Sequence, residues 1–331
     1  MLGLNNLVKI SESKSQLETG VFTISLDFEL IWGTLDLFGP EQFRRACEIE
    51  REQIIDALLD LFVEFEFPAT WCILGHLFLD SCSGKHPEIT RTNHDWVKGD
   101  WFEFDPGEVE NSKSIFSGRS LVEKIKNCPV PQEIGSHSFS HVIFSDKGCS
   151  QAAAESEIAE SVRLAKEMDI EMRSFAFPRN EVGHLKVLKE FGFLCYRGVE
   201  PNWYENRRVP EKLRRVIRLF EVLRAAEPPT VLPEMTKSGI WNIPGSSIYF
   251  PMHGFRKYIP LKLRTNRAIK GLNAAAKNKR IFHLWFHPTN LADDIDEMIK
   301  GLRDILEYAT KLRESGKLRF LTMQDVICSN E

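Results

Sequence analysis

The chain has 331 residues, of which 43% are hydrophobic and 27% charged, and its formal net charge is −4. This composition is typical of a globular protein with a sizeable core, and the small negative charge argues against a nucleic-acid partner. The sequence contains no run of about 18 or more apolar residues, so no integral membrane segment is predicted, and no secretory signal is recognisable. The seven cysteines form no C-x-x-C pair, so neither a disulfide framework nor a zinc knuckle is expected. We therefore expect a cytoplasmic protein.

The first predicted strand is followed directly by two acidic residues. Residues 21–26 are apolar and β-branched, as expected of a buried strand, and Asp27-Phe28-Glu29 comes next. Because side chains alternate along an extended backbone, Asp27 and Glu29 are expected to point to the same side. A helix cap is the alternative role for Asp27. Helical periodicity over 41–65 and a second strand at 68–74 follow.

A long polar and aromatic segment at about 76–115 contains Trp96 and Trp101. Irregular segments of this length inside a domain are usually lids or binding walls, which makes both tryptophans candidates for substrate contact. Exposed aromatic residues suit a subunit contact equally well, so a homo-oligomer is the competing interpretation.

Two histidines, His137 and His141, lie four residues apart directly after a short apolar run that predicts a third strand. If a helical turn begins there, an i, i+4 pair projects both imidazoles from one face, which is a common way to bind one divalent metal ion. The alternative is one surface histidine and one packed in the core.

Two later strands also end in polar residues. Arg179 follows the predicted strand 173–177, and His287 follows the strand 281–286, which carries Trp285. A structural turn is the alternative role for His287, which precedes a proline. Further helices are predicted at 117–127, 150–168, 182–191, 261–277 and 293–315, and further strands at 193–196, 239–244 and 318–321.

This alternation predicts an α/β protein with a parallel sheet. The candidate residues follow the C-terminal ends of several strands, which favours a (β/α) barrel over a doubly wound sheet, where a ligand binds only at a switch point. We expect an N-terminal extension at 1–20 and one barrel domain at 21–327. Insertions are expected at about 76–115 and 200–238, the latter with one basic helix.

Four motifs in this order resemble the NodB-type polysaccharide deacetylase family, also called carbohydrate esterase family four. They are SLDFE at 25–29, HSFSH at 137–141, FAFPR at 175–179 and LWFHP at 284–288. The resemblance spans about 21–327. It implies a distorted (β/α) barrel of about seven parallel strands, a bound divalent metal ion and hydrolysis of an N-acetyl group on a sugar.

By this resemblance His137 and His141 take the metal positions, Asp27 the catalytic base and His287 the general acid. Arg179 matches a position that orients the base or lines the substrate groove.

One departure concerns the first motif, where Phe28 replaces the second of two adjacent Asp residues. Glu29 then becomes the expected carboxylate ligand beside the base Asp27, and an exchange of these two roles stays open. Zinc is the expected ion, although nitrogen and oxygen ligands also accept cobalt, nickel or iron.

The predicted function is a metal-dependent hydrolase that removes an N-acetyl group from a sugar, in a polysaccharide or a surface-glycan precursor. Trp96, Trp101 and Trp285 are then candidates for stacking on the sugar. A first alternative on the same barrel is a C–N hydrolase of a cyclic ureide or imide, or a deformylase. A second is a carbohydrate-binding relative without catalysis, because the first motif is altered.

Overall fold

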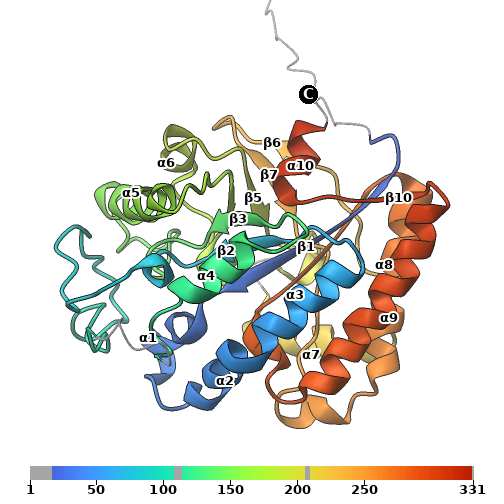
Figure 1. Ribbon diagram of the computed structural model, residues 1–331, viewed down its shortest axis with the longest axis horizontal. Coiled ribbons are helices and arrows are strands. Elements are labelled where there is room, and N and C mark those ends of the chain that lie inside the picture. Colours follow the sequence, from blue (N-terminus) through green and yellow to red (C-terminus); the bar gives the residue numbers. More distant parts are fainter. Residues whose placement is uncertain (1–16, 108–113, 206–208, 330–331) are drawn as a thin grey trace, which may run out of the picture.

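The structure is a computed structural model that describes residues 17–107, 114–205 and 209–329. A curled, mainly parallel sheet lies at its centre, with helices around the outside (Figure 1). The first strand, β1 (Gly20–Phe28), is buried along its whole length and pairs in parallel with β2, β9 and β10. The other strands are β2 (Thr70–Ile73), β3 (Glu133–Ser136), β4 (Ser174–Ala176), β5 (Cys195–Gly198), β6 (Glu234–Met235), β7 (Trp241–Pro244), β8 (Ser247–Ile248), β9 (Ile281–Phe286) and β10 (Leu318–Phe320).

The strand order is β6-β7-β5-β4-β3-β2-β1-β9-β8, and one short run of chain joins its two ends. Residues 241–248 pair with β5 through β7 and then with β9 through β8. Between these strands, the N–H of Gly245 donates to the carbonyl of Gly198, and the N–H of Ser246 donates to that of His283. The parallel strands β1, β2, β3, β4, β5, β7 and β9 thus form the predicted distorted barrel, while β6 is antiparallel.

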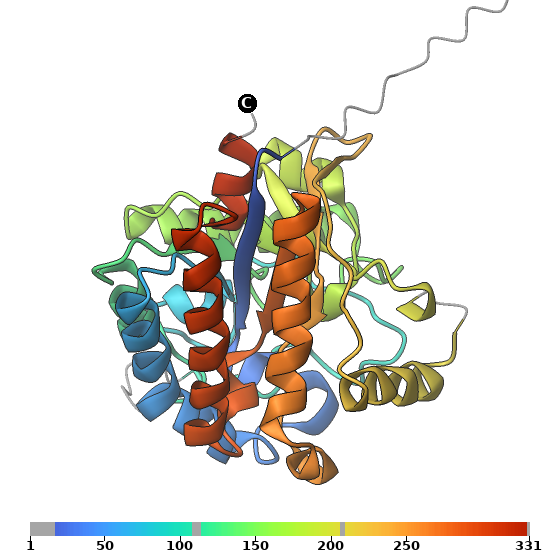
Figure 2. The same cartoon turned by 90° about the vertical axis from the view of Figure 1, so that its right-hand side faces the viewer.

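Helices cover the outside of this sheet, and α8 and α9 lie side by side across β1 and β9 (Figure 2). The helices are α1 (Leu35–Phe38), α2 (Arg44–Ile49), α3 (Ile55–Glu64), α4 (Arg119–Lys126), α5 (Gln151–Glu167), α6 (Leu185–Glu190), α7 (Glu211–Leu223), α8 (Leu261–Asn278), α9 (Ile295–Glu314) and α10 (Met323–Cys328). The core between layers is aromatic: the ring of Phe22 lies 5.1 Å from Phe67 and 5.7 Å from Phe282. The positions of the helices follow their apolar periodicity.

The predicted continuous helix at 41–65 is divided in the structure. A π-helical turn over residues 50–54 separates α2 from α3. A π turn adds a residue to the helical repeat and so changes which side chains face inward. Here it turns Glu50 and Arg51 into the interior, where the Arg51 guanidinium donates to the carbonyl of Ser117.

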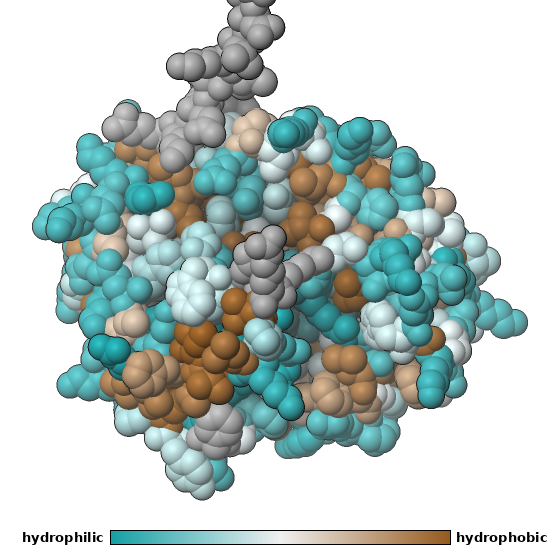
Figure 3. Space-filling model, turned by 180° about the vertical axis from the view of Figure 1, so that it is seen from behind, coloured by the Kyte–Doolittle hydropathy of each residue, from teal (hydrophilic) through white to brown (hydrophobic). Residues whose placement is uncertain are grey.

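The basic helix predicted within 200–238 is α7, which lies on the far side of the molecule in Figure 1 and exposes Leu213, Val216, Phe220 and Leu223. Figure 3, which faces that side, shows a patch of hydrophobic surface there. None of the helices in the described part of the chain is long and apolar enough to cross a membrane.

Candidate metal and active site

Two buried carboxylates mark the C-terminal end of β1. Asp27 is 2% exposed and Glu29 is 6% exposed. The chain turns sharply after Glu29, because Leu30 adopts a positive φ of 47° and begins a short 3₁₀ helix, Leu30–Gly33. The Glu29 carboxylate then lies against Gly33, where a Cβ atom would be only 1.8 Å from Glu29 Oε1. Only glycine at this position leaves room for the carboxylate.

The histidine pair lies on a loop after β3, and the helical turn considered from the i, i+4 spacing is absent. Instead, Ser138 and His141 have positive φ angles of 65° and 66°. The loop is held by the buried carboxylate of Glu157 in α5, which accepts hydrogen bonds from the N–H groups of Phe139 and Ser140 at 2.9 and 2.8 Å. The Ser140 hydroxyl donates to the same carboxylate at 2.6 Å. These bonds to a side chain of α5 replace helical ones, and they turn both imidazoles inward.

The loop brings both histidines to Glu29. Glu29 Oε2 lies 3.1 Å from His137 Nε2 and 3.2 Å from His141 Nε2. His137 Nδ1 lies 2.8 Å from the Ala176 carbonyl oxygen, which can only accept, so the Nδ1 atom carries the proton. A neutral His137 therefore turns a lone pair on Nε2 toward the carboxylate. Neither that nitrogen nor Glu29 Oε2 makes a hydrogen bond.

These three side chains fit a divalent cation. Two imidazole nitrogens and a carboxylate oxygen that converge in this way are the donors that zinc and similar ions take. The hydrogen bond from His137 Nδ1 to a carbonyl is the usual support of a metal-binding histidine. Burial raises the pKa of Glu29, but His287 and His141 outweigh it and hold the pKa well below its usual value. Glu29 is therefore ionised, as a ligand must be.

Asp27 is bound by an arginine that the sequence did not single out as a site residue. Arg197, at the end of β5, is 1% exposed and contacts both Asp27 oxygens, at 2.7 and 2.6 Å. Burial raises the pKa of Asp27, whereas the Arg197 charge lowers it, and the net effect is a lowered pKa. Arg197 also donates to the Ser25 hydroxyl, whose oxygen lies 2.8 Å from His283 Nε2. This buried chain fixes the orientation of Asp27.

Arg179, which the resemblance placed at the base or in the groove, does not contact Asp27. It forms an ion pair with Asp36, and its guanidinium lies 5.4 Å from the Trp96 ring centroid. The backbone explains this, since Arg179 has a positive φ of 54° that turns its side chain to the surface. Arg197 takes the place beside Asp27 instead.

His287 approaches the two carboxylates from the C-terminal end of the neighbouring strand β9. Its Nε2 atom lies 3.7 Å from Asp27 Oδ2 and 3.5 Å from Glu29 Oε1, and the side chain is 28% exposed. Trp285, two residues earlier on β9, lies under the Arg197 guanidinium at 4.5 Å and donates from its indole to Glu200 at 3.0 Å. His287 is thus a partly exposed imidazole beside a buried, charged centre.

The other two tryptophans lie on the side of the histidine loop. The Trp101 indole donates to the Ser140 carbonyl at 2.8 Å, so it anchors the 76–115 segment to that loop. Trp96 is 40% exposed, and its indole donates to Asp146 at 3.2 Å. Their rings meet edge to face at 6.0 Å.

A pocket of about 470 Å³ opens beside Glu29 and His287. Its walls come from the 3₁₀ helix after β1 and from residues 42–49, 251–256 and 287–293, and they include Phe43, Ile49 and Arg256. Among the residues that line it, none comes from the described part of 76–115. The predicted wall therefore stands on another side of the site than this pocket.

The carboxylate and imidazole side chains thus gather at the C-terminal ends of the parallel strands, where barrel enzymes have their active sites. No family model matches the sequence, and no curated protein matches it. Solved structures do match. A Mycobacterium smegmatis protein assigned as a polysaccharide deacetylase has a TM-score of 0.60 and 12% identity, covering 94% of this chain and 91% of that one.

Two further solved structures are similar to this chain over nearly its whole length. A Pseudomonas aeruginosa PAO1 protein assigned as a polysaccharide deacetylase has a TM-score of 0.57 and 11% identity, covering 92% of this chain and 89% of that one. The PuuE allantoinase has a TM-score of 0.53 and 12% identity, covering 92% and 88%. At this identity the likeness concerns the fold alone. The predicted NodB-type deacetylase fold is thereby confirmed.

Proposed function

We propose that this protein is a metal-dependent amide hydrolase that removes an N-acetyl group from a sugar. The observation that carries the proposal is the convergence of Glu29 Oε2 with His137 Nε2 and His141 Nε2 at 3.1 and 3.2 Å. We assign these three residues as ligands of one divalent ion, zinc first. The Arg197 clamp on both oxygens of Asp27 supports Glu29, rather than Asp27, as the carboxylate ligand.

A divalent ion bound there supplies Lewis-acid chemistry, which makes water more acidic and an acyl carbonyl more electrophilic. Asp27, ionised and oriented by Arg197, accepts the proton of the attacking water. His287, on the open side of the site, donates a proton to the departing amine. The general base and the general acid thus approach the scissile amide from neighbouring strand ends.

The pocket beside Glu29 supports a short substrate. Its volume of about 470 Å³ is that of a small-molecule site, large enough for one or two sugar rings. Arg256 at its wall adds positive charge, which suits an anionic carrier group on the sugar. We therefore propose a glycan precursor rather than a long polymer as the substrate, with Trp285 beside the acyl site.

A ring-opening hydrolase of a cyclic ureide is the second candidate, because the same small pocket suits a compact cyclic amide and the allantoinase shares the fold. Purified protein reconstituted with zinc should be incubated with nucleotide-linked N-acetylhexosamine, with short N-acetylglucosamine oligomers and with allantoin. Equimolar acetate and free amine support the deacetylase. Ring opening without acetate supports the second candidate, and no turnover of any substrate contradicts both enzymatic proposals.

Two variants sharpen this assay. His141→Ala removes a proposed ligand and should lose turnover and one equivalent of metal. His184→Asn is the matched control, because His184 has a positive φ of 50°, which Asn tolerates. Its ring contacts the Cys149 carbonyl and the Phe144 ring, and neither residue belongs to the site. It should keep both activity and metal.

A further inference from the structure

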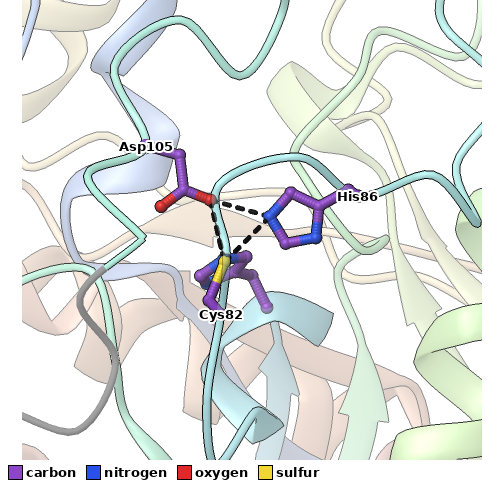
Figure 4. A group of neighbouring side chains, drawn as sticks. Cys82, His86 and Asp105 are labelled. Carbon is purple, nitrogen blue, oxygen red and sulfur yellow. Dashed lines mark hydrogen bonds and ion pairs between the residues drawn. The ribbon is translucent and has the colours of Figure 1, made fainter.

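A second group of potential metal ligands lies in the segment that follows β2. His76 belongs to the 3₁₀ helix Gly75–Phe78, Cys82 and His86 lie on the loop after it, and Asp105 comes from the far part of the same segment. Figure 4 shows Cys82, His86 and Asp105 facing one another. The four ligand atoms all lie within 4.8 Å of one another. This group shares no residue with the Glu29 site.

The distances are those of donors around a common centre. Asp105 Oδ2 lies 2.7 Å from His86 Nε2, 3.2 Å from His76 Nε2 and 3.3 Å from Cys82 Sγ. A tetrahedral zinc ion with bonds of about 2.0–2.3 Å separates its donors by about 3.3–3.8 Å. A small outward movement of the four side chains would therefore admit the ion.

The histidines are oriented as metal ligands are. His76 Nδ1 lies 3.1 Å from the Phe116 carbonyl oxygen, so it carries the proton, and Nε2 of a neutral His76 then presents a lone pair to the Asp105 carboxylate. His86 repeats the pattern, with Nδ1 3.1 Å from the Glu88 carboxylate and Nε2 pointing inward. Oxygen acceptors on the outer nitrogen are the usual support of zinc-bound histidine. Lone pairs that face one another this closely call for a cation or for extra protons.

We propose that His76, Cys82, His86 and Asp105 bind a structural zinc ion. A thiolate with two imidazoles selects zinc over calcium or magnesium, which prefer oxygen ligands. Four protein donors complete a tetrahedron and leave no open position for substrate, as in structural sites. His76 is fully buried and His86 is 4% exposed, so the ion would be shielded on that side.

The ion would fasten a segment that has little other regular structure. Between the 3₁₀ helix and α4, the described residues 79–107 and 114–118 form no helix or strand. The ligands join the beginning of this segment to Asp105. They also touch the first site indirectly, because the N–H of His76 donates to the carbonyl of Phe139 on the histidine loop. The zinc ion would thus hold the segment against the loop that carries His137 and His141.

Metal content and cobalt spectra test this proposal on the full chain. Protein stripped with a chelator and reloaded with zinc should contain two equivalents, and Cys82→Ser should contain one. Cys328→Ser, which changes an exposed cysteine, is the control and should keep two. Reloaded with cobalt, the wild type and Cys328→Ser should show a thiolate-to-cobalt charge-transfer band in the near ultraviolet, and Cys82→Ser should not.

His86→Gln is a second variant that removes a proposed ligand, and it should also contain one equivalent of zinc. The cobalt spectrum of the wild-type protein tests the site without any substitution. A wild-type protein without the thiolate band, or a zinc content that neither variant lowers, would overturn the proposal. The first site is separable, because His141→Ala should lose one equivalent and keep the thiolate band. Lack of deacetylase activity would therefore leave this result intact.

Discussion

Arg197 determines what Asp27 can do. A buried guanidinium that contacts both carboxylate oxygens orients Asp27 and keeps it ionised, but it also leaves neither partner dispensable. Ser25 and His283 extend this support behind Arg197. The base proposed for hydrolysis is thus part of a buried ion pair, and its replacement is expected to change both activity and stability.

Asp27→Asn should lower turnover about a hundredfold or more, because the amide cannot accept the proton. It should also lower the free energy of unfolding by about 3–5 kcal/mol, because Arg197 becomes an unpaired buried charge. Bound metal should persist, since Glu29 and both histidines remain. Steady-state kinetics, urea unfolding and metal analysis check these outcomes. A metal-free variant would instead assign Asp27 as the ligand.

Adding Arg197→Met to Asp27→Asn separates the two effects. Removing the unpaired charge should recover much of the lost stability, whereas turnover should stay low. Recovery of turnover in the double variant would show that Asp27 acts only as a partner of Arg197.

His283 should make stability depend on pH. Burial, aided by the Arg197 charge, lowers the pKa of His283 to about 3. Since an unfolded histidine has a pKa near 6.5, the unfolded chain binds a proton between these values and the folded chain does not. Stability is therefore lost as the pH falls below about 6.5, by roughly 1.4 kcal/mol per pH unit.

The variant His283→Gln has no titrating group but can keep a hydrogen bond to Ser25. Between pH 7 and pH 5 the wild type should lose about 2 kcal/mol more unfolding free energy than this variant. Urea unfolding at constant ionic strength measures the difference. If the unfolding free energies of the two proteins changed with pH in parallel, the pH dependence assigned to His283 would be contradicted.

At the scale of elements, the loop that carries His137 and His141 depends on helix α5. The residue of α5 that holds it, Glu157, lies 20 residues after His137 and 16 after His141. Glu157 in α5 accepts three hydrogen bonds from residues between His137 and His141. Without them, two buried N–H groups and a hydroxyl would lack partners, and the positive φ angles of the loop would lose their support. The two proposed metal-binding histidines are thus held in position from outside their own segment.

Glu157→Ala should weaken metal binding at the Glu29 site about 10- to 100-fold, the usual effect of losing a group that orients ligands. Glu157→Gln is the matched control, because its amide oxygen can still accept from both N–H groups and its NH₂ can donate to the Ser140 hydroxyl. Competition with a chelator gives both affinities. Wild-type affinity in the alanine variant would contradict this role for α5.

At the scale of the whole molecule, two metal ions would act as cross-links between segments far apart in the chain. The first site joins β1 to the loop after β3, and the second joins the two parts of the 76–115 segment. Ligands that bind only the folded state stabilise it by mass action. Both sites together therefore couple barrel stability to metal supply.

Chelation should lower the melting temperature, and added zinc should restore it. With free zinc about a thousandfold above the dissociation constant, each site contributes roughly 4 kcal/mol. Differential scanning calorimetry of the wild type, Cys82→Ser and His141→Ala should show a smaller zinc response in either variant. If a variant with both Cys82→Ser and His141→Ala still showed the full rise in melting temperature with zinc, neither site would be the origin of that rise.

The sequence by itself determined the alternation of elements, the parallel barrel and the chemical character of the strand ends. These features are local: apolar periodicity defines a helix or strand, and parallel strands place their C-terminal ends at one edge. The order of Asp27, Glu29, His137, His141 and His287 along these ends was therefore readable without coordinates.

The tertiary structure alone decided which of these groups meet. Arg197 rather than Arg179 reaches Asp27, because the backbone of Arg179 turns outward and β5 points Arg197 into the barrel. The ligands proposed for the second site escaped sequence reasoning because His76 and Asp105 are 29 residues apart with no regular spacing between them. Such contacts depend on how an irregular segment folds back on itself, and no local period encodes that.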